Sequence, residues 1–91
     1  VAAAGNSGIN IDSSPTYPAS YNVPNVLSVG ASNSFDYSAS FSNFGVNNVH
    51  IGSPGVGVLS TVACNTADIS CSYTASMSGT SMAAPFLAGI A

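Results

Sequence analysis

The chain has 91 residues, of which 46% are hydrophobic, and it carries a formal net charge of −3 without any Lys or Arg. Binding to nucleic acid needs basic residues that neutralise phosphates, and adhesion to anionic membranes needs basic clusters, so this composition argues against both. No apolar stretch approaches the about 20 residues that a membrane-spanning helix requires. The composition therefore predicts a packed domain that acts on neither nucleic acid nor a membrane.

The first half of the chain alternates short apolar runs with loop-forming residues. Residues 1–4 indicate the end of a buried strand that residues 5–8, Gly-Asn-Ser-Gly, terminate. Residues 9–24 are rich in Asn, Ser, Pro and Tyr, which predicts a long ordered loop. Residues 25–31 form an apolar run bounded by turn signals, which predicts a fully buried strand of a parallel sheet. Residues 38–44 alternate Ser with Ala or Phe, the period-two pattern of a half-buried strand.

Two short elements and a pair of cysteines follow. Residues 50–51 precede a Gly-Ser-Pro-Gly turn, residues 58–61 form another short strand, and residues 63–78 are predicted to be a hairpin or loop. Cys64 and Cys71 lie seven positions apart within it. A disulfide between them would suit an oxidising compartment, and two free thiols fit the sequence nearly as well.

The chain is predicted to end in a helix. From Thr80 onward Ala, Met, Phe, Leu and Ile favour helix, and either Ser78 or Thr80 could cap it. Proline is tolerated near the first turn of a helix, where its missing N–H costs little, so Pro85 places Ser81 at or beside the helix N-terminus.

A serine at a helix start has the setting that nucleophilic catalysis needs. A hydroxyl attacks well only when a base removes its proton and nearby donors stabilise the oxyanion. The free N–H groups and the positive dipole end of a helix N-terminus supply such donors. Gly79 permits a tight turn and close approach of a substrate backbone. On these features alone Ser81 could equally be a helix cap, because many helices begin Gly-Thr-Ser.

Several motifs together resemble one protein family. Residues 79–85, Gly-Thr-Ser-Met-Ala-Ala-Pro, resemble the active-serine motif of subtilases, the subtilisin-like serine proteases, with Ser81 at the nucleophile. Residues 2–6, Ala-Ala-Ala-Gly-Asn, resemble the family's segment that carries the Asn of the oxyanion hole. The same order of family-like segments continues between them at residues 17–19, 26–31, 39–45 and 53–55. The resemblance therefore covers essentially the whole chain.

The resemblance implies roles for individual residues. Ser81 would attack the scissile carbonyl, and its backbone N–H and the side-chain amide of Asn6 would hold the oxyanion. Ala3 and Gly5 would line the pocket for the substrate residue before the cleaved bond, and Thr80 would help to orient the hole through its hydroxyl. Taken alone, Asn6 after Gly5 would be interpreted as a turn residue.

The resemblance also implies what this chain lacks. In subtilases the Asp and His of the triad precede the oxyanion Asn, so they are expected upstream of Val1. Asp36, His50 and Ser81 do occur in that order here. His50 lacks the His-Gly-Thr setting of the family's base, so we expect a packing role for it and a turn role for Asp36. Phe86 stands where many relatives have His, and we expect it to pack in the core.

No metal or cofactor is expected within these residues, although full-length relatives often bind structural calcium. His50 stands where bacterial subtilisins often carry an Asp that helps to form a weak cation site with carbonyls near residues 17–19. Calcium prefers oxygen ligands, and an imidazole is a poor substitute. We therefore expect this weak site to be absent or altered.

The expected fold is α/β, the doubly wound and mostly parallel subtilase sheet flanked by helices. Residues 1–91 are expected to be an incomplete C-terminal portion of the catalytic domain, without useful proteolysis of their own. The parent would be a secreted serine endopeptidase with a polypeptide substrate and an N-terminal propeptide in its precursor. One alternative is a catalytically dead subtilase-fold binding module. Another is a secreted structural or adhesive β-protein, which would have no reason to combine a Gly-Thr-Ser helix start with Asn6.

Overall fold

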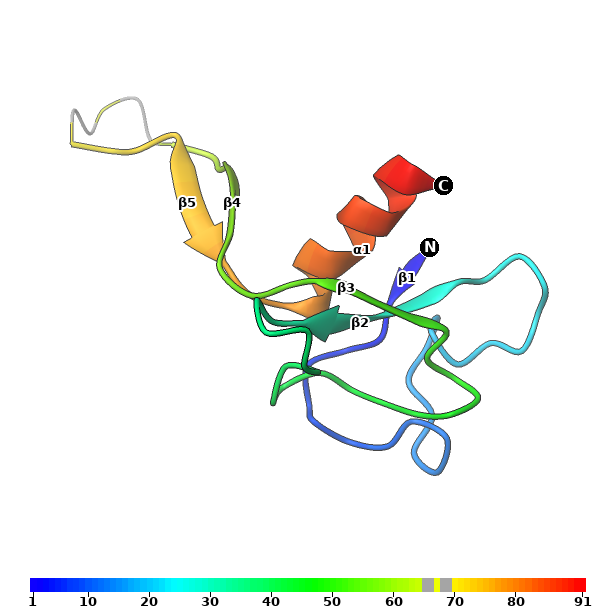
Figure 1. The fold of residues 1–91 in the computed structure, drawn as a ribbon. Coiled ribbons are helices and arrows are strands. Elements are labelled where there is room, and N and C mark those ends of the chain that lie inside the picture. The colour runs from blue at the N-terminus through cyan, green and yellow to red at the C-terminus, as the bar shows by residue number, and fades with distance from the viewer. Residues whose placement is uncertain (65–66, 68–69) are drawn as a thin grey trace.

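A small parallel sheet forms the centre of the molecule. The computed structural model describes residues 1–64, 67 and 70–91. The sheet contains β1 (Ala2–Ala3), β2 (Ser28–Ser32) and β3 (Ile51–Pro54) in the order β1-β2-β3, and both pairings are parallel (Figure 1). The structure confirms a buried parallel strand within the predicted residues 25–31, because the first four residues of β2 are buried, but the strand begins at Ser28 and not at residue 25. The predicted strand at the start of the chain is also present, as β1.

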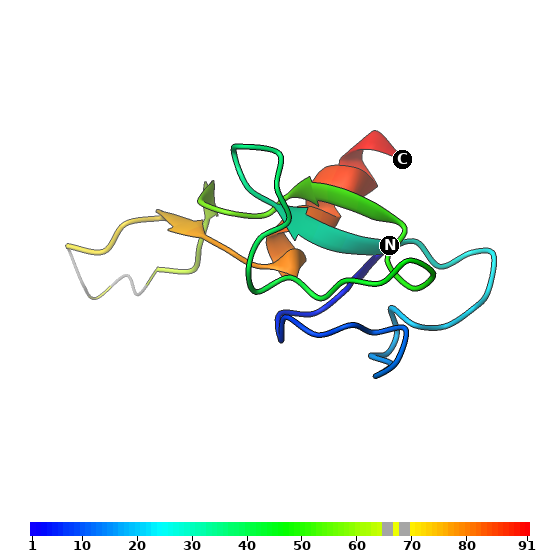
Figure 2. The same ribbon diagram turned by 60° about the horizontal axis from the view of Figure 1, so that its bottom comes forward.

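One helix, α1 (Thr80–Ile90), covers one face of this sheet (Figure 2). Its contact side is set by Ala83 and Leu87, which lie four residues apart and therefore share one face of the helix. They pack against Val29 and Ala31 of the central strand β2. The core on this side consists of buried Val29, Ala31, Ala39, Ala83 and Leu87. Its small residues allow the helix to lie close to the sheet.

Gly55 makes that close approach possible where the helix begins. A Cβ at Gly55 would lie 2.6 Å from the Cβ of Ala31 and 2.8 Å from the carbonyl oxygen of Gly79. The Gly79 N–H donates to the Gly55 carbonyl over 2.8 Å. The start of α1 is therefore held directly beyond the carboxyl end of β3.

The opposite face of the sheet is covered by the segment that includes residues 9–24 (Figure 2). This segment forms turns and one isolated bridge, from Asn10 to Phe44, as its loop-forming residues predict. Ala4, Ile11 and Ala19 are buried together beneath it. The loop therefore has an apolar core of its own.

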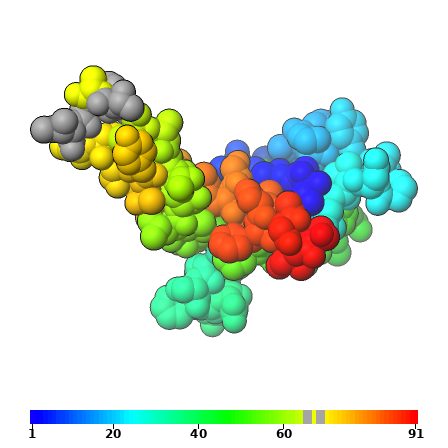
Figure 3. All heavy atoms as spheres, turned by 90° about the horizontal axis from the view of Figure 1, so that it is seen from above, coloured from blue at the N-terminus to red at the C-terminus, as the bar shows by residue number. Residues whose placement is uncertain are grey.

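The hairpin of β4 (Val58–Thr61) and β5 (Thr74–Met77) is antiparallel and projects from the body of the molecule (Figure 3). It confirms the predicted strand at residues 58–61. Residues 63–78, predicted to be a hairpin or loop, supply the second strand of this hairpin, and residues 65, 66, 68 and 69 lie outside the described part. A disulfide joins Cys64 and Cys71, whose Cα atoms are 5.9 Å apart. Of the two states that the sequence left open for these cysteines, the structure contains the bonded one.

Two local predictions were wrong. Residues 38–44 do not form a strand, and only their ends make isolated bridges, from Ser38 to Ser32 and from Phe44 to Asn10. Ser42 and Asn43 are buried next to each other, which breaks the period-two pattern. The Gly-Ser-Pro-Gly segment is not a turn either, because Ile51–Pro54 pairs in parallel with β2. Pro54 is tolerated there because β3 is an edge strand of the sheet.

Within the described residues, no helix has the length and apolar character needed to cross a membrane.

Candidate active site

The two segments that resemble catalytic motifs meet at one edge of the parallel sheet. The N–H of Ala4, directly after β1, donates to the carbonyl of Val29 over 2.9 Å, and the chain then turns through Gly5 and Asn6. Gly79 is bonded to Gly55, directly after β3. Both segments therefore lie beyond the carboxyl ends of parallel strands, where α/β proteins generally bind their ligands.

Asn6 and Thr80 are joined by a short hydrogen-bond network. The Oδ1 of Asn6 accepts from the backbone N–H of Thr80 over 2.8 Å and from the Thr80 hydroxyl over 2.8 Å. The Thr80 hydroxyl in turn accepts from the Gly5 N–H over 3.1 Å. Thr80 is almost fully buried, with 1% of its surface exposed. Asn6 thus caps α1 from a distant loop, whereas neither Ser78 nor Thr80 caps it through a side chain.

This network sets the direction of the Asn6 amide. Two donors occupy Oδ1, so the amide nitrogen, Nδ2, must lie on the other side of the side chain. A Cβ built on Gly79 would lie 3.5 Å from that Nδ2 and 3.8 Å from the backbone N of Ser81. The two donor nitrogens therefore lie within 4 Å of one point beside Gly79, and the sulfur of Met82 lies 3.4 Å from the same point.

The Ser81 N–H is the free donor at the helix start. Of the first four N–H groups of α1, that of Thr80 donates to Asn6, and those of Met82 and Ala83 donate to the Gly79 carbonyl. Among the described residues, neither the N–H nor the hydroxyl of Ser81 has a hydrogen-bond partner. Ser81 is also exposed. The geometry therefore provides an accessible hydroxyl beside two unused donors, which suits stabilisation of an oxyanion.

Ser81 is the second residue of α1, in agreement with its predicted place at the helix start. Pro85, however, is the sixth residue and lies beyond the first turn where it was expected. Its missing N–H would have bonded to the carbonyl of Ser81, four residues earlier. The prediction that Phe86 packs in the core was wrong, because 48% of its surface is exposed. The helix side with Ala83 and Leu87 faces the sheet, which turns Phe86 outward.

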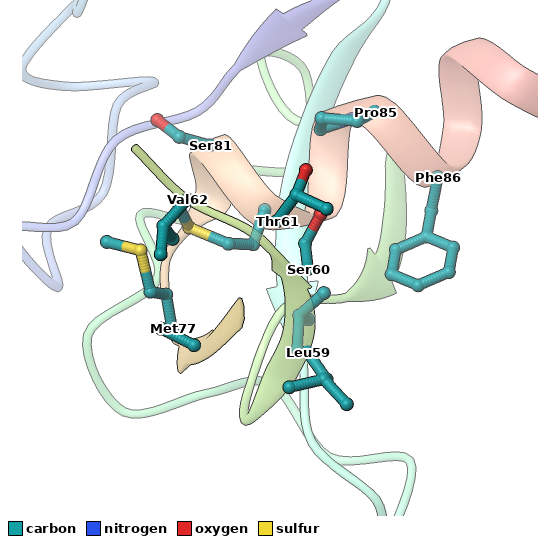
Figure 4. Close-up of a pocket in the computed structure, with 11 residues that line it drawn as sticks. Leu59, Ser60, Thr61, Val62, Met77, Ser81, Pro85 and Phe86 are labelled. Carbon is teal, nitrogen blue, oxygen red and sulfur yellow. The ribbon is translucent and has the colours of Figure 1, made fainter. Parts of the chain in front are cut away.

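A pocket of about 390 Å³ lies between α1 and the hairpin of β4 and β5. Ser81 lies at the first turn of the helix beside it, and Phe86 lies further along the helix (Figure 4). Most of its walls are apolar. The side chains that line it include Val58, Leu59, Val62, Met77, Met82 and Pro85.

The structure keeps His50 away from Ser81. The Nδ1 of His50 accepts from the backbone N–H of Ser28 over 2.9 Å, at the amino end of β2. Ser81 lies beyond the carboxyl end of the sheet, so the two residues are at opposite ends of the parallel strands. Asp36 has a φ of 64° in an exposed turn and donates its N–H to Asn33, which confirms its predicted turn role.

The other residues singled out in the sequence lie at different distances from this centre. Gly5 is part of it through its bond to Thr80. Ala3 pairs with Val29 in the sheet and is half-buried. Cys64 and Cys71 lie beyond the paired residues of the hairpin.

Comparison with known proteins decides the family. The profile of the subtilase family matches residues 1–91. The chain belongs to the subtilase family.

Individual subtilases are similar to this chain over its whole length. The thermophilic serine proteinase of Bacillus sp. (strain AK1) is 49% identical over 92 residues, which cover 100% of this chain and 20% of that protein. The extracellular basic protease of Dichelobacter nodosus is 46% identical over 91 residues, which cover 100% of this chain and 14% of that protein. The chain therefore spans only a small part of the length of these subtilases.

Solved structures support the fold. The crystal structure of a cold adapted subtilisin-like serine proteinase superposes with a TM-score of 0.72 and 36% sequence identity, covering 97% of this chain and 28% of that one. The structure of the prenylagaramide maturation protease PagA gives a TM-score of 0.70 and 30% identity. The α/β fold of the subtilases, expected from the sequence, is therefore confirmed.

Sequence reasoning assigned no role to Ser42 and Asn43. Both are buried, with 3% and 2% of their surfaces exposed, and their side chains bond to backbone groups near Asn6 and in β2. The signal was present in the family-like segment 39–45, where two polar residues stand next to Phe41 and Phe44. Their partners are far away in the sequence, so the segment alone could not show what they do.

Proposed function

We propose that the full-length protein containing these residues is a serine endopeptidase that cleaves polypeptides through an acyl-enzyme on Ser81. The observation that carries this proposal is the approach of the Ser81 N–H and the Asn6 amide to one point beside an exposed serine hydroxyl. Membership of the subtilase family supports it.

In the proposed reaction, the Ser81 oxygen forms a bond to the scissile carbonyl carbon while a general base takes the hydroxyl proton. The carbonyl electron pair moves to oxygen, where the Asn6 amide and the Ser81 N–H donate to the resulting oxyanion. The amine then leaves with the proton, and water hydrolyses the acyl-enzyme. The positive end of α1 favours the same negative charge.

The base and the residue that orients it are proposed to be a His and an Asp upstream of residue 1, in the subtilase order. The greater length of the related proteases supports this. Large apolar side chains with much of their surface exposed, such as Val46 at 94% and Ile90 at 81%, are consistent with burial against other parts of a larger domain. Without those groups, the 91 residues alone are expected to have no useful protease activity.

The full-length protein is also proposed to be secreted and to mature from a precursor with an N-terminal propeptide. Relatives named extracellular proteases support the location. The disulfide between Cys64 and Cys71 suits an oxidising compartment.

Labelling with a fluorophosphonate tests the proposal. The probe should attach to the peptide that contains Ser81 in the full-length protein, and mass spectrometry should find no label there in Ser81→Ala. Label retained on a folded Ser81→Ala variant shows that another residue is the nucleophile. A folded parent protein that takes no label supports the alternative of a catalytically dead binding module.

The substitution Gly79→Ala is expected to lower kcat about 10-fold or more without unfolding the protein. Its methyl group would stand at the point that the two oxyanion donors approach. Backbone strain does not arise, because the φ of Gly79 is 160° and its ψ is 161°, an extended conformation. Displacement of a reacting group by about 1 Å can lower the rate by as much as about 10²-fold. Kinetics on a peptide substrate measure kcat, and Gly89→Ala, where a Cβ would meet nothing within 4 Å, is the control.

The residues here do not fit the family's weak cation site. His50 offers an imidazole whose Nδ1 is already used by the Ser28 N–H, instead of a carboxylate oxygen. We expect added calcium to raise the Tm of His50→Asp more than that of the parent protein in calorimetry. An equal rise in both proteins would show that residue 50 does not decide calcium binding.

A further inference from the structure

We infer that Asn43 is a positioning residue of the oxyanion hole, whose buried side chain holds the loop that presents Asn6 to the substrate. The inference rests on the proposed serine protease function and names a residue to which that mechanism gives no part. Asn43 has only 2% of its surface exposed. Its side-chain amide has an NH2 group that donates and an oxygen that accepts, so both need hydrogen-bond partners inside the protein.

The Asn43 side chain bonds the backbone on both sides of Asn6. Its Nδ2 donates to the carbonyl of Ala4 over 2.9 Å. Its Oδ1 accepts from the N–H of Ser7 over 3.0 Å and from the N–H of Ile9 over 3.2 Å. One side chain thus fixes the backbone two residues before Asn6 and one and three residues after it.

Backbone contacts place Asn43 tightly against the same loop. Its N–H donates to the Gly5 carbonyl over 2.9 Å. Gly5 has a φ of 105°, and a Cβ there would overlap the Nδ2 of Asn43. The Gly5 N–H bonds to the Thr80 hydroxyl, which itself bonds to Asn6. A shift of Asn43 would therefore reach Asn6 through its own loop and through the start of α1.

Asn43 is itself tied to the centre of the sheet through Ser42. The buried Ser42 hydroxyl accepts from the Ala31 N–H over 2.9 Å and donates to the Asn43 carbonyl over 3.0 Å. Ala31 lies in β2, the middle strand. These hydrogen bonds connect the loop that carries Asn6 to β2, the most buried strand of the described structure. Support from such a rigid element gives a loop a precise geometry.

The test is a double-mutant cycle in the full-length protein. Asn43→Leu, which keeps the branched shape of the side chain but removes its three hydrogen bonds, should lower kcat about 10- to 100-fold. In an Asn6→Ala background the same substitution should lower kcat by less than about twofold, because the group that it positions is already missing. Titration with a fluorophosphonate counts the competent sites, so that kcat refers to folded enzyme.

Asn48→Leu is the matched control. The Asn48 side chain donates to the Ile11 carbonyl over 3.0 Å in the same region, and no bond of that side chain reaches residues 4–9. We expect Asn48→Leu to change kcat by less than about twofold in either background.

If Asn43→Leu does not fold, Asn43→Asp replaces it in the cycle. That variant keeps the acceptor for Ser7 and Ile9, and it replaces the donor to Ala4 by a carboxylate oxygen that repels the Ala4 carbonyl.

A purely structural role of Asn43 would lower kcat by the same factor with and without Asn6, and that result overturns the inference. An unchanged kcat in Asn43→Leu, together with a reduced kcat in Asn6→Ala, also overturns it but leaves the proposed function intact. If Ser81→Ala retains turnover, the proposed function itself fails, so the two failures are distinguishable.

Discussion

Replacing Ser81 by Ala in the full-length protein is expected to lower kcat about 10⁶-fold, while KM and Tm stay close to those of the parent. This magnitude is the one known for loss of the nucleophile in subtilisin, a member of the same family, and it is taken over from that enzyme. Among the described residues the Ser81 hydroxyl has no hydrogen-bond partner, and the side chain is exposed. Its removal therefore costs chemistry and hardly any stability.

Hydrolysis of a chromogenic peptide measures the loss, and calorimetry measures Tm. Ser78→Ala is the control, because Ser78 lies three residues earlier and its hydroxyl accepts from the Gly57 N–H over 2.9 Å. That change should leave kcat within about twofold of the parent, because it removes a bond at the hairpin and none in the site. A decrease of less than tenfold in Ser81→Ala would show that Ser81 is not the nucleophile.

Substitutions at Asn6 are expected to separate its two roles. Asn6→Ala should lower kcat about 10²- to 10³-fold, the effect known for loss of the oxyanion-hole Asn in subtilisin itself. It should also destabilise the protein by about 1 kcal/mol, because Oδ1 no longer caps the Thr80 N–H. KM should change little, since the lost donor acts mainly on the transition state.

Asn6→Asp is the sharper variant of the pair. Its carboxylate keeps an acceptor for both donors of Thr80 and carries a negative charge that the helix N-terminus favours. It lacks the N–H that the oxyanion needs, so kcat should fall at least as far as in Asn6→Ala while Tm stays near that of the parent. Parallel measurements of kcat and Tm on the two variants check this. An Asn6→Asp variant with full turnover would refute the oxyanion role.

Much of the candidate site could be predicted from local sequence. The place of Ser81 at a helix start follows from the helix-forming residues after Gly79, and the structure agrees to within one residue. The buried strand β2 follows from an apolar run between turn signals. Both depend on interactions between near neighbours, which the sequence shows directly.

Patterns that depend on distant partners were misjudged. Residues 38–44 alternate as a strand does, but Ser42 and Asn43 take buried partners in β2 and in the loop around Asn6 instead of pairing along a ladder. The Gly-Ser-Pro-Gly segment has turn composition, but the edge of β2 holds it extended as β3. In both places the available hydrogen-bond partners decided the backbone shape, and local propensity did not.

The sequence by itself determined the family of the chain and indicated Asn6 and Ser81 as the candidate site residues, because short ordered motifs contain both of them. Only the tertiary structure decided how these residues work together. Asn6 and Thr80 are 74 positions apart, and their bonds set which atom of the Asn6 amide is free. Asn43 lies 39 positions from Ala4, and only the folded chain brings the two residues into contact. Such contacts depend on the path of the whole backbone, and no local pattern contains them.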